Sequence, residues 1–323
     1  MNMRTHVSML AAATAVAVLT IPAAAYRQEA TLAYKWTKGE TLRYRMAQTT
    51  DTTMSGLPGG MPDVTLNQVL NQAFKMTVDD LAADGVVTLS QVFESMRMEV
   101  TTPAGKVVID SATPPAGGAP QEQIAQKIFA ALVGEPLTVV LAPSGKVQKV
   151  EGFNRLIDKM AASVPSDPAA SAAIRQLKAG MGDEQMNAMF SQGFPQFPQR
   201  ALKAGDTWST SASMPNPVFG AVNTTTELTL ASIDGRTAKL LAKTKMERDP
   251  KAEGMQAPMG MKPDMGPSTG EAEMFFDIAN GRLRSATANI VMPLSMSGTA
   301  PDGTPVNMKT NAKSTVKMEL IEK

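Results

Sequence analysis

The sequence contains no cysteine, and its single histidine, His6, lies within the first 25 residues. Histidine is the commonest general acid–base residue, a cysteine thiolate is a common nucleophile, and both are the usual zinc ligands. If residues 1–25 are removed, neither side chain remains. This excludes thiol catalysis, histidine-based catalysis and ordinary zinc binding for the rest of the chain. Aromatic residues are also few, at 5% of the sequence.

Residues 1–25 have the three parts of a secretory signal peptide. Arg4 supplies the positive charge, residues 7–21 form an apolar segment, and Ala23 to Ala25 give the small-residue pattern at which such peptides are cleaved. The apolar segment is too short to span a bilayer comfortably, and no later apolar run approaches that length. We therefore expect cleavage after Ala25, a secreted or periplasmic protein, and no transmembrane anchor after cleavage.

The charge of the chain is balanced. Arg4 is the one charged residue of the signal segment, so 31 basic and 30 acidic residues become 30 of each after cleavage. No basic run with interleaved aromatic residues occurs, so we expect no nucleic-acid partner. The apolar content of 43% is typical of globular proteins, and residues 26–323 are enough for a large packed core without disulfides.

Most of the chain after residue 26 has the pattern of strands separated by tight turns. Residues 41–53 alternate Leu42, Tyr44 and Met46 with polar neighbours, which is the period of a half-buried strand. Strand-like runs flank turns at residues 83–85, 103–105, 144–145, 234–235, 279–281 and 301–303. Successive hairpins of this kind favour an antiparallel meander over alternating βα units.

Helical patterns are confined to the middle of the chain. Residues 121–133 and 153–162 place apolar side chains at helical spacing, an N-cap and proline at 167–168 open a helix to about 179, and Asp183 caps a short fourth helix. The fold class we predict is α+β, mainly β: an antiparallel curved sheet or half-barrel with a central helical insertion at 121–200.

We expect residues 26–323 to form a single β-rich domain, in which 26–120 and 201–323 are candidate pseudo-repeats. The Lys38–Leu42 sequence KGETL resembles KAGDTW at 203–208, and an Asp-Gly hairpin follows each. A turn of the form Gly-Lys or Gly-Arg comes later in both, at Gly105 and Gly281. Such turns are common in β proteins, so chance recurrence is the alternative explanation.

One methionine-rich segment suggests metal chemistry. Met255, Met259, Met261 and Met265 lie within residues 250–270, which also contain four prolines and read as a long loop. Thioethers are soft ligands that suit Cu(I), so these four residues are a candidate copper site. The alternative is a flexible insertion without ligand, since the chain has 24 methionines. We expect no other cofactor.

Carboxylate pairs are the remaining catalytic candidates. Glu94 with Glu99, and Glu271 with Glu273 and Asp277, could support a carboxylate-dependent hydrolase such as a glycosidase. In a strand, Glu271, Glu273 and Asp277 project to one face, which is equally the pattern of a solvated sheet surface. We therefore expect the chain not to be an enzyme.

Two further patterns each have a functional and a structural explanation. Ser314 and Lys317 match the letters S-x-x-K, but this spacing in a strand sends the two side chains to opposite faces, so lysine cannot activate serine. Trp36 and Trp208 each flank a KGET-like turn, and could either cap a ligand groove or seal the end of a sheet.

Several segments resemble a family of uncharacterised secreted bacterial proteins, grouped as a domain of unknown function. They are YKWTKGETLRYRM at 34–46, LVGEPLTVVLAPSGKVQKVEG at 132–152, KAGDTW at 203–208, FFDIANGRL at 275–283 and TVKMEL at 315–320. The resemblance covers nearly all of residues 26–323 and brings no catalytic residues. The strand–Gly-Lys/Arg–strand pattern is also similar to periplasmic lipoprotein carriers, in which a curved half-barrel wraps helices over an apolar cavity. That similarity is architectural and transfers no function.

Three functions follow from these patterns. The first is an exported, non-enzymatic envelope protein that binds a hydrophobic small molecule, a lipid or a protein partner on a concave face. The second is a structural or interaction module of the envelope. The third comprises the methionine copper binder and the carboxylate hydrolase.

Overall fold

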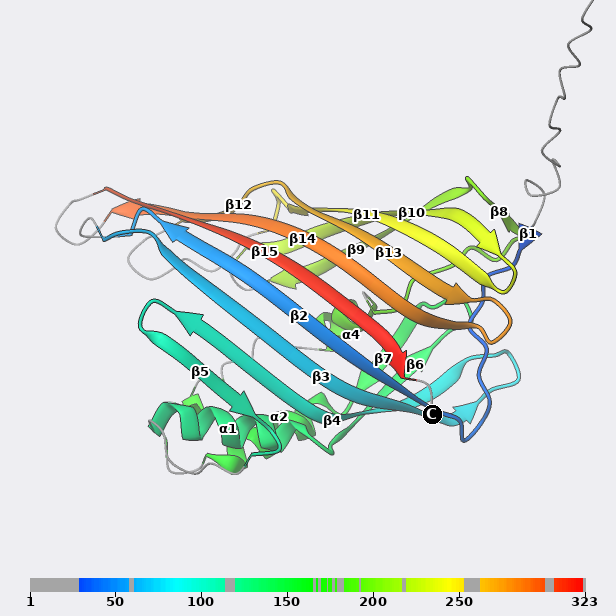
Figure 1. Ribbon diagram of the computed structural model, residues 1–323, viewed down its shortest axis with the longest axis horizontal. Helices are drawn as coiled ribbons and strands as arrows, with labels where there is room; N and C mark the ends of the chain where they lie inside the picture. Colours follow the sequence, from blue (N-terminus) through cyan, green and yellow to red (C-terminus); the bar gives the residue numbers. More distant parts are fainter. Residues whose placement is uncertain are drawn as a thin grey trace, which may run out of the picture.

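The computed structural model describes residues 29–57, 61–113, 120–164, 167, 170–172, 174–175, 178, 183–191, 193–216, 219–252, 262–299 and 305–321. These residues form one large antiparallel sheet, a two-stranded sheet and a few helices (Figure 1). The predicted class, mainly-β α+β, is confirmed.

The large sheet has thirteen described strands. They are β2 (Thr41–Ser55), β3 (Val64–Leu81), β4 (Val87–Thr102), β5 (Gly105–Asp110), β6 (Pro136–Leu141), β7 (Val147–Glu151), β9 (Thr207–Asn216), β10 (Gly220–Asp234), β11 (Thr237–Arg248), β12 (Lys262–Met265), β13 (Ser268–Asp277), β14 (Arg282–Thr299) and β15 (Pro305–Ile321). Their order is β7-β6-β4-β3-β2-β15-β14-β13-β11-β10-β9, with β5 paired to β4 and β12 paired to β14. The last described strand, β15, thus pairs with β2 in the middle of the sheet order.

Among the described residues, helices with assigned bounds are α1 (Pro120–Leu132), α2 (Phe153–Ser163) and α4 (Asp183–Ser191). α1 and α2 pack together around Ile157 and Met160, in a small cluster separate from the main core. α4 contacts both β7 and β9, the strands at the two ends of the sheet order. One helix can reach both edges because the sheet is strongly curved, and α4 lies behind its central strands in Figure 1. The predicted curved sheet with helices from the middle of the chain is confirmed.

Most predicted hairpins and helices occur, with two corrections. The segments at 86–92 and 96–102, predicted as two strands, form the single strand β4. The long loop predicted at 250–270 is wrong for its second part, where β12 and the start of β13 form. Pro263 and Pro267 suggested a loop, but β12 pairs only with β14, and Pro267 falls in the break between β12 and β13. Parts of the 167–179 helix and the 301–303 turn lie outside the described residues.

The KGETL and KAGDTW segments enter their strands in the same way. Gly39 N donates to Val78 O (2.9 Å) and Val78 N donates to Glu40 O (2.8 Å). In the other half, Gly205 N donates to Leu230 O (2.8 Å) and Leu230 N donates to Asp206 O (3.0 Å). A β-bulge follows Val78 in β3 and Leu230 in β10.

If the two halves are repeats, the strand order makes Gly145 the position equivalent to Gly281, in place of the predicted Gly105. The β6–β7 and β13–β14 turns contain these two glycines, and a bulge precedes each turn at Val140/Leu141 and Phe275/Phe276. Both glycines have positive φ, 87° and 61°. The two pseudo-repeated halves stay a prediction, but a repeat would include β6 and β7, which lie beyond residue 120.

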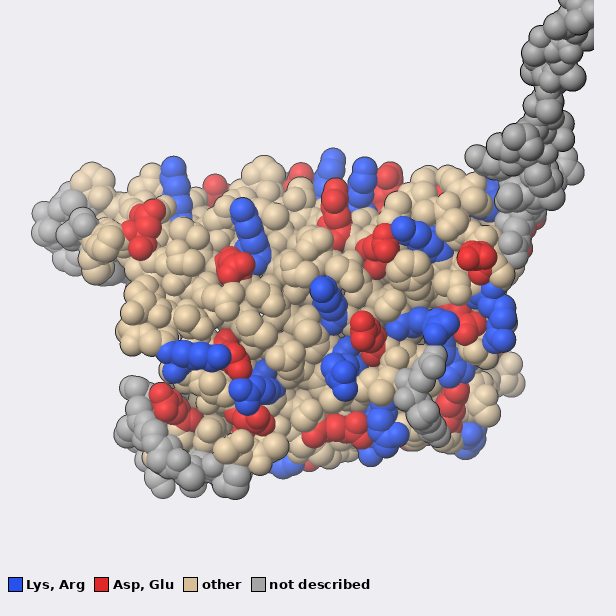
Figure 2. Space-filling model, viewed as in Figure 1, with Lys and Arg blue, Asp and Glu red and all other residues tan. Residues whose placement is uncertain are grey.

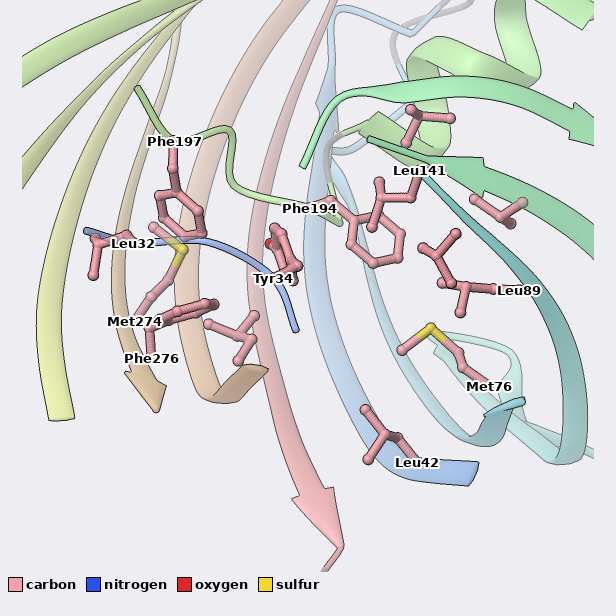
Figure 3. Packing of buried hydrophobic residues seen from close by; sticks show 14 of the residues in the cluster. Leu32, Tyr34, Leu42, Met76, Leu89, Leu141, Phe194, Phe197, Met274 and Phe276 are labelled. Atoms are coloured by element: carbon pink, nitrogen blue, oxygen red, sulfur yellow. The ribbon is translucent and has the colours of Figure 1, made fainter. Parts of the chain in front are cut away.

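The centre of the core is Tyr34, which lies on the extended segment before β2. Its ring is 5.5 Å from those of Phe197 and Phe276 and 5.9 Å from that of Phe194, measured between centroids. Figure 3 shows Tyr34 between Leu32, Phe197, Met274 and Phe276 on one side and Phe194, Leu141 and Leu89 on the other. These side chains come from both halves of the sheet, so Tyr34 packs the halves together.

Backbone hydrogen bonds fix the segments that cross this core. Lys35 N donates to Gly281 O (3.2 Å) in the β13–β14 turn, and Tyr34 N donates to Pro143 O (3.3 Å) in the β6–β7 turn. Phe197 N donates to Ser144 O (2.8 Å) in the same turn. The entry segment of each half is therefore bonded to a turn of the other half.

Gly281 is where this crossing requires glycine. Its φ is 61°, and a Cβ there would lie 2.4 Å from Lys35 N and 2.7 Å from Ala33 O. We predict that Gly281→Ala lowers the free energy of unfolding by about 3 kcal/mol, because positive φ and backbone overlap both oppose a side chain. Gly235→Ala is the matched control. The φ of Gly235 is 55°, and a Cβ built there would have no atom within 4 Å, so this variant should cost about 1 kcal/mol. Urea unfolding of both variants checks this, and equal costs would contradict the crossing geometry.

Candidate functional site

The concave face of the sheet carries no charged side chain along its central strands, as far as the described residues show. Inward-facing positions follow from the register and burial patterns. They are Leu42, Tyr44, Met46, Gln48, Thr50, Thr52 and Met54 in β2, Val306, Met308, Thr310, Ala312, Ser314, Val316, Met318 and Leu320 in β15, and Ala286, Ala288, Ile290, Met292, Leu294 and Met296 in β14. The face is built of aliphatic, methionine and small hydroxyl side chains.

The charges of these strands are instead on the convex face. Arg43, Arg45 and Asp51 alternate with the inward residues of β2, and Lys309, Lys313, Lys317 and Glu319 alternate with those of β15. Figure 2 shows the convex face with both signs of charge spread over it. Because successive strand residues point to opposite faces, one alternation in the sequence separates a wetted surface from an apolar one.

The concave face encloses an apolar cavity of about 340 Å³ against the end of α4. Its walls are inward residues of β2, β3, β4 and β15, with Met189, Phe190 and Phe194 from α4 and the segment after it. Arg282 is the one charged residue in this lining, whose other members include Tyr34, Trp36, Tyr44, Met46, Phe74, Met76, Phe93 and Met318. The cavity is within the size range of small-ligand pockets, at its lower end.

A second, smaller cavity of about 210 Å³ lies over the inward face of β10, β11, β13 and β14. Two of its hydroxyl groups, Thr226 Oγ1 and Thr244 Oγ1, lie 3.0 Å apart and form a hydrogen bond. Phe194 lines both cavities, so its ring is the partition between them. Phe194 is itself nearly buried, at 9% exposure.

A polar hollow of about 660 Å³ lies outside the sheet, where β15 ends. The last described β15 residue, Ile321, pairs with Arg43, and β14 pairs with β15 only from Ser285 onward. Beyond that point β2 and β14 face each other without a described strand between them. Two contacts bridge this gap: Arg282 Nη1 lies 2.8 Å from Glu40 Oε1, and Tyr44 Oη donates to Leu283 O (3.0 Å).

Burial controls the ionisation of the two core tyrosines. Desolvation raises the pKa of Tyr34 and of Tyr44, so both phenols stay neutral and act as hydrogen-bond donors. Tyr34 Oη donates to Pro195 O (3.2 Å), which ties the segment after α4 to the core.

Two buried polar atoms near this site have no hydrogen-bond partner among the described residues: Trp36 Nε1 and Glu40 Oε2. Trp36 lines the apolar cavity, whereas Glu40 lines the outer hollow. Trp208 differs, because its Nε1 donates to Gln196 O (2.7 Å) while its ring packs near Phe197. The sequence allowed each tryptophan either to cap a ligand groove or to seal the end of the sheet. Trp36 lines a cavity, whereas Trp208 packs against the core.

The predicted copper residues are only partly described. Met255, Met259 and Met261 lie outside the described residues, and Met265 is a buried residue of β12 that pairs with Leu294. No group of three or more His, Asp or Glu residues suited to a metal is found within the described ranges. The copper site stays a prediction.

Three of the predicted carboxylates, Glu273, Glu94 and Glu99, form ion pairs with basic side chains, and Glu271 is exposed on β13. Glu273 Oε2 is 2.8 Å from Lys239 Nζ, Glu94 Oε1 is 3.2 Å from Arg43 Nε, and Glu99 Oε1 is 2.7 Å from Arg97 Nη2. None of these contacts forms the facing pair across a cleft that glycoside hydrolysis requires. Their positions fit the alternative explanation, a solvated sheet surface.

Ser314 and Lys317 lie on opposite faces of β15, as the strand spacing predicted. Ser314 faces inward, where its Oγ accepts a hydrogen bond from Gln48 Nε2 (3.2 Å). Lys317 faces outward. The serine is therefore part of the neutral polar lining.

Sequence reasoning did not single out Arg282 or Phe194. Arg282 read as an ordinary residue of a Gly-Arg turn, and Phe194 lies in a segment without helical or strand period. Arg282 pairs with Asp277, beside the inward-facing Leu283, so the alternation of inward and outward residues gave no signal for it.

A family model described as a family of unknown function (DUF6263) matches residues 84–281, more than half of the chain. The chain belongs to this family. The predicted resemblance to a domain of unknown function is thereby confirmed, while similarity to lipoprotein carriers stays a prediction. A comparison of this DUF6263 member with curated proteins finds no match.

Among solved structures, lipovitellin is similar over 89% of this chain and 26% of its own, at 11% identity and a TM-score of 0.44. This chain thus spans about a quarter of lipovitellin. DynF from the dynemicin biosynthesis pathway of Micromonospora chersina matches with 9% identity and a TM-score of 0.20, covering 94% of this chain and 92% of DynF. An outer membrane channel from Pseudomonas putida F1 matches with 9% identity and a TM-score of 0.26, over 88% of this chain and 97% of its own. These scores are too low to inform function.

None of the described helices is long and apolar enough to cross a membrane.

Asp277 stabilises the turn that carries Arg282. Burial opposes its ionisation, but hydrogen bonds from Asn280 N (2.9 Å) and Asn280 Nδ2 (2.8 Å) outweigh this and lower the pKa of the carboxyl. A lowered folded pKa means that the stabilisation is present above the unfolded value of about 3.9 and is lost as pH falls through the folded value.

We predict that Asp277→Asn lowers the free energy of unfolding by about 1 kcal/mol at pH 7 and by clearly less at pH 3. Urea unfolding at the two pH values measures this. Asp63→Asn, at an exposed position before β3, is the control and should stay within about 0.5 kcal/mol of the wild type. A pH-independent difference for Asp277→Asn would contradict the role of the carboxylate.

Proposed function

We propose that this protein is an exported, non-enzymatic binder of an apolar ligand, which it holds on the concave face of its curved sheet. The observation that carries the proposal is the cavity of about 340 Å³ on a sheet face without charge along its central strands. A lipid acyl chain is the ligand class that fits such walls. The signal-peptide pattern of residues 1–25 supports an extracytoplasmic location.

The driving force for binding would be burial of apolar surface. Removing a methylene group from water contributes about 0.8 kcal/mol, so even a short acyl chain supplies a useful affinity. Met46, Met76, Met189 and Met318 line the cavity, and methionine adapts its shape to irregular apolar ligands. A cavity of this volume favours a single chain over a multi-chain lipid.

The neutral fluorescent probe N-phenyl-1-naphthylamine tests this proposal, because it has no charged head group. Wild-type protein should bind it saturably. Met46→Glu should weaken binding at least 10-fold, because a carboxylate would enter the apolar lining, where charge is strongly disfavoured.

Ala47→Glu is the matched control, since Ala47 is the next residue of β2 and faces outward. It should bind the probe within about 2-fold of the wild type, a difference well under 1 kcal/mol. Thermal melting shows whether both variants fold. Absence of saturable binding to the wild type, or equal loss in both variants, would refute the proposal.

A further inference from the structure

Among the described residues, the lining of the apolar cavity contains two neutral amide side chains, Gln72 and Gln91, and one charged side chain. Arg282 is its one charged residue, and it also lines the polar hollow outside the sheet. It therefore stands at the boundary between an apolar compartment and a wetted one. A ligand that lies across this boundary must be amphiphilic, with its apolar part inside.

The guanidinium of Arg282 is held in place by its neighbours. Nη1 lies 2.8 Å from Glu40 Oε1, and Nε donates to Asn280 O (3.3 Å). The side chains of Arg282 and Glu40 are only 20% and 23% exposed, so this pair is a shielded one.

Trp36 supplies a second donor in the lining of the same cavity. Its Nε1 is buried and has no acceptor among the described residues, although a buried donor without a partner is destabilising. The hydrogen bond from Lys35 N to Gly281 O (3.2 Å) brings the residues just before Trp36 and Arg282 together. Trp36 and Arg282 thus both line the apolar cavity, and Trp36 Nε1 is a donor in its wall without an acceptor among the described residues.

We propose that the ligand is a single-chain carboxylate amphiphile, a fatty acid, whose carboxylate is held by the guanidinium of Arg282 and by Trp36 Nε1 while its chain fills the apolar cavity. This inference rests on the proposed function and adds the head group. A carboxylate supplies acceptor oxygens for both donors and adds only one negative charge beside the Arg282–Glu40 pair. A phosphate monoester would place up to two charges near Glu40, where like charges repel.

Glu40 acts here as a positioning residue. It contacts Arg282 and not the ligand, and its pairing with Nη1 holds the guanidinium in place. Arg284, two residues further along β14, lines only cavities outside the apolar one and is the matched control for charge.

The test is a titration of purified wild-type protein with oleate, methyl oleate and oleyl phosphate, by displacement of N-phenyl-1-naphthylamine. We expect oleate to bind at least 10-fold more tightly than methyl oleate and more tightly than oleyl phosphate. Arg282→Gln should weaken oleate at least 10-fold and methyl oleate less than about 2-fold, since a lost charged hydrogen bond has that magnitude. Arg284→Gln should change neither.

Trp36→Phe keeps an aromatic ring and removes only Nε1–H, so it serves if Arg282→Gln does not fold. It should weaken oleate about 5-fold and leave methyl oleate unchanged. If the wild type binds methyl oleate as well as oleate, or if Trp36→Phe affects both equally, the head-group site is wrong and the apolar binder stands. If oleyl phosphate binds more tightly than oleate, the assignment of a carboxylate head group is wrong and a phosphate takes its place. If none of the three compounds displaces the probe from the wild type, the proposed function itself fails.

Discussion

The structure depends on one constraint: a charge-free sheet face that is longer than the elements packed deeply against it. β3 and β14 have 18 residues each, which corresponds to about 60 Å of extended chain. In β2 the fully buried inward residues are Leu42 and Tyr44 at its start, whereas Thr50, Thr52 and Met54 are only half-buried. The sheet therefore has a tightly packed end, where the turns and α4 meet, and a more open end. The apolar cavity lies at the transition between them.

The packed end is stable because chain segments from the two halves cross there. Tyr34 contacts aromatic rings contributed by β13 and by the segment after α4. Backbone hydrogen bonds join Lys35 to the β13–β14 turn and Phe197 to the β6–β7 turn. Because the chain has no cysteine, noncovalent packing and these hydrogen bonds stabilise the packed end without disulfides. The same crossing brings Trp36 and Arg282 to one cavity wall.

The sequence could predict the elements that show a clean period. Leu42, Tyr44 and Met46 against polar neighbours gave β2, and the Asp-Gly and Gly-Arg turns gave the hairpins. It could not show that Thr50, Thr52 and Ser314 face inward, because hydroxyl residues occupy both faces of those strands and blur the alternation. Met265 read as part of a loop because Pro263 and Pro267 flank it, yet it is a buried strand residue. Arg282 gained its significance only from the contacts that tertiary packing creates between distant segments.

Methyl NMR of the methionines offers the most direct measurement of the central claim, that the concave face is a binding surface for an apolar chain. The methyl groups of Met46, Met76, Met189 and Met318 line the cavity, whereas Met61 is 56% exposed and lies away from it. On titration with a fatty acid, the four cavity methyl signals should shift together and saturate, while the Met61 signal stays in place. Shifts confined to Met61, or no saturable shift at the four cavity methionines, would contradict the account.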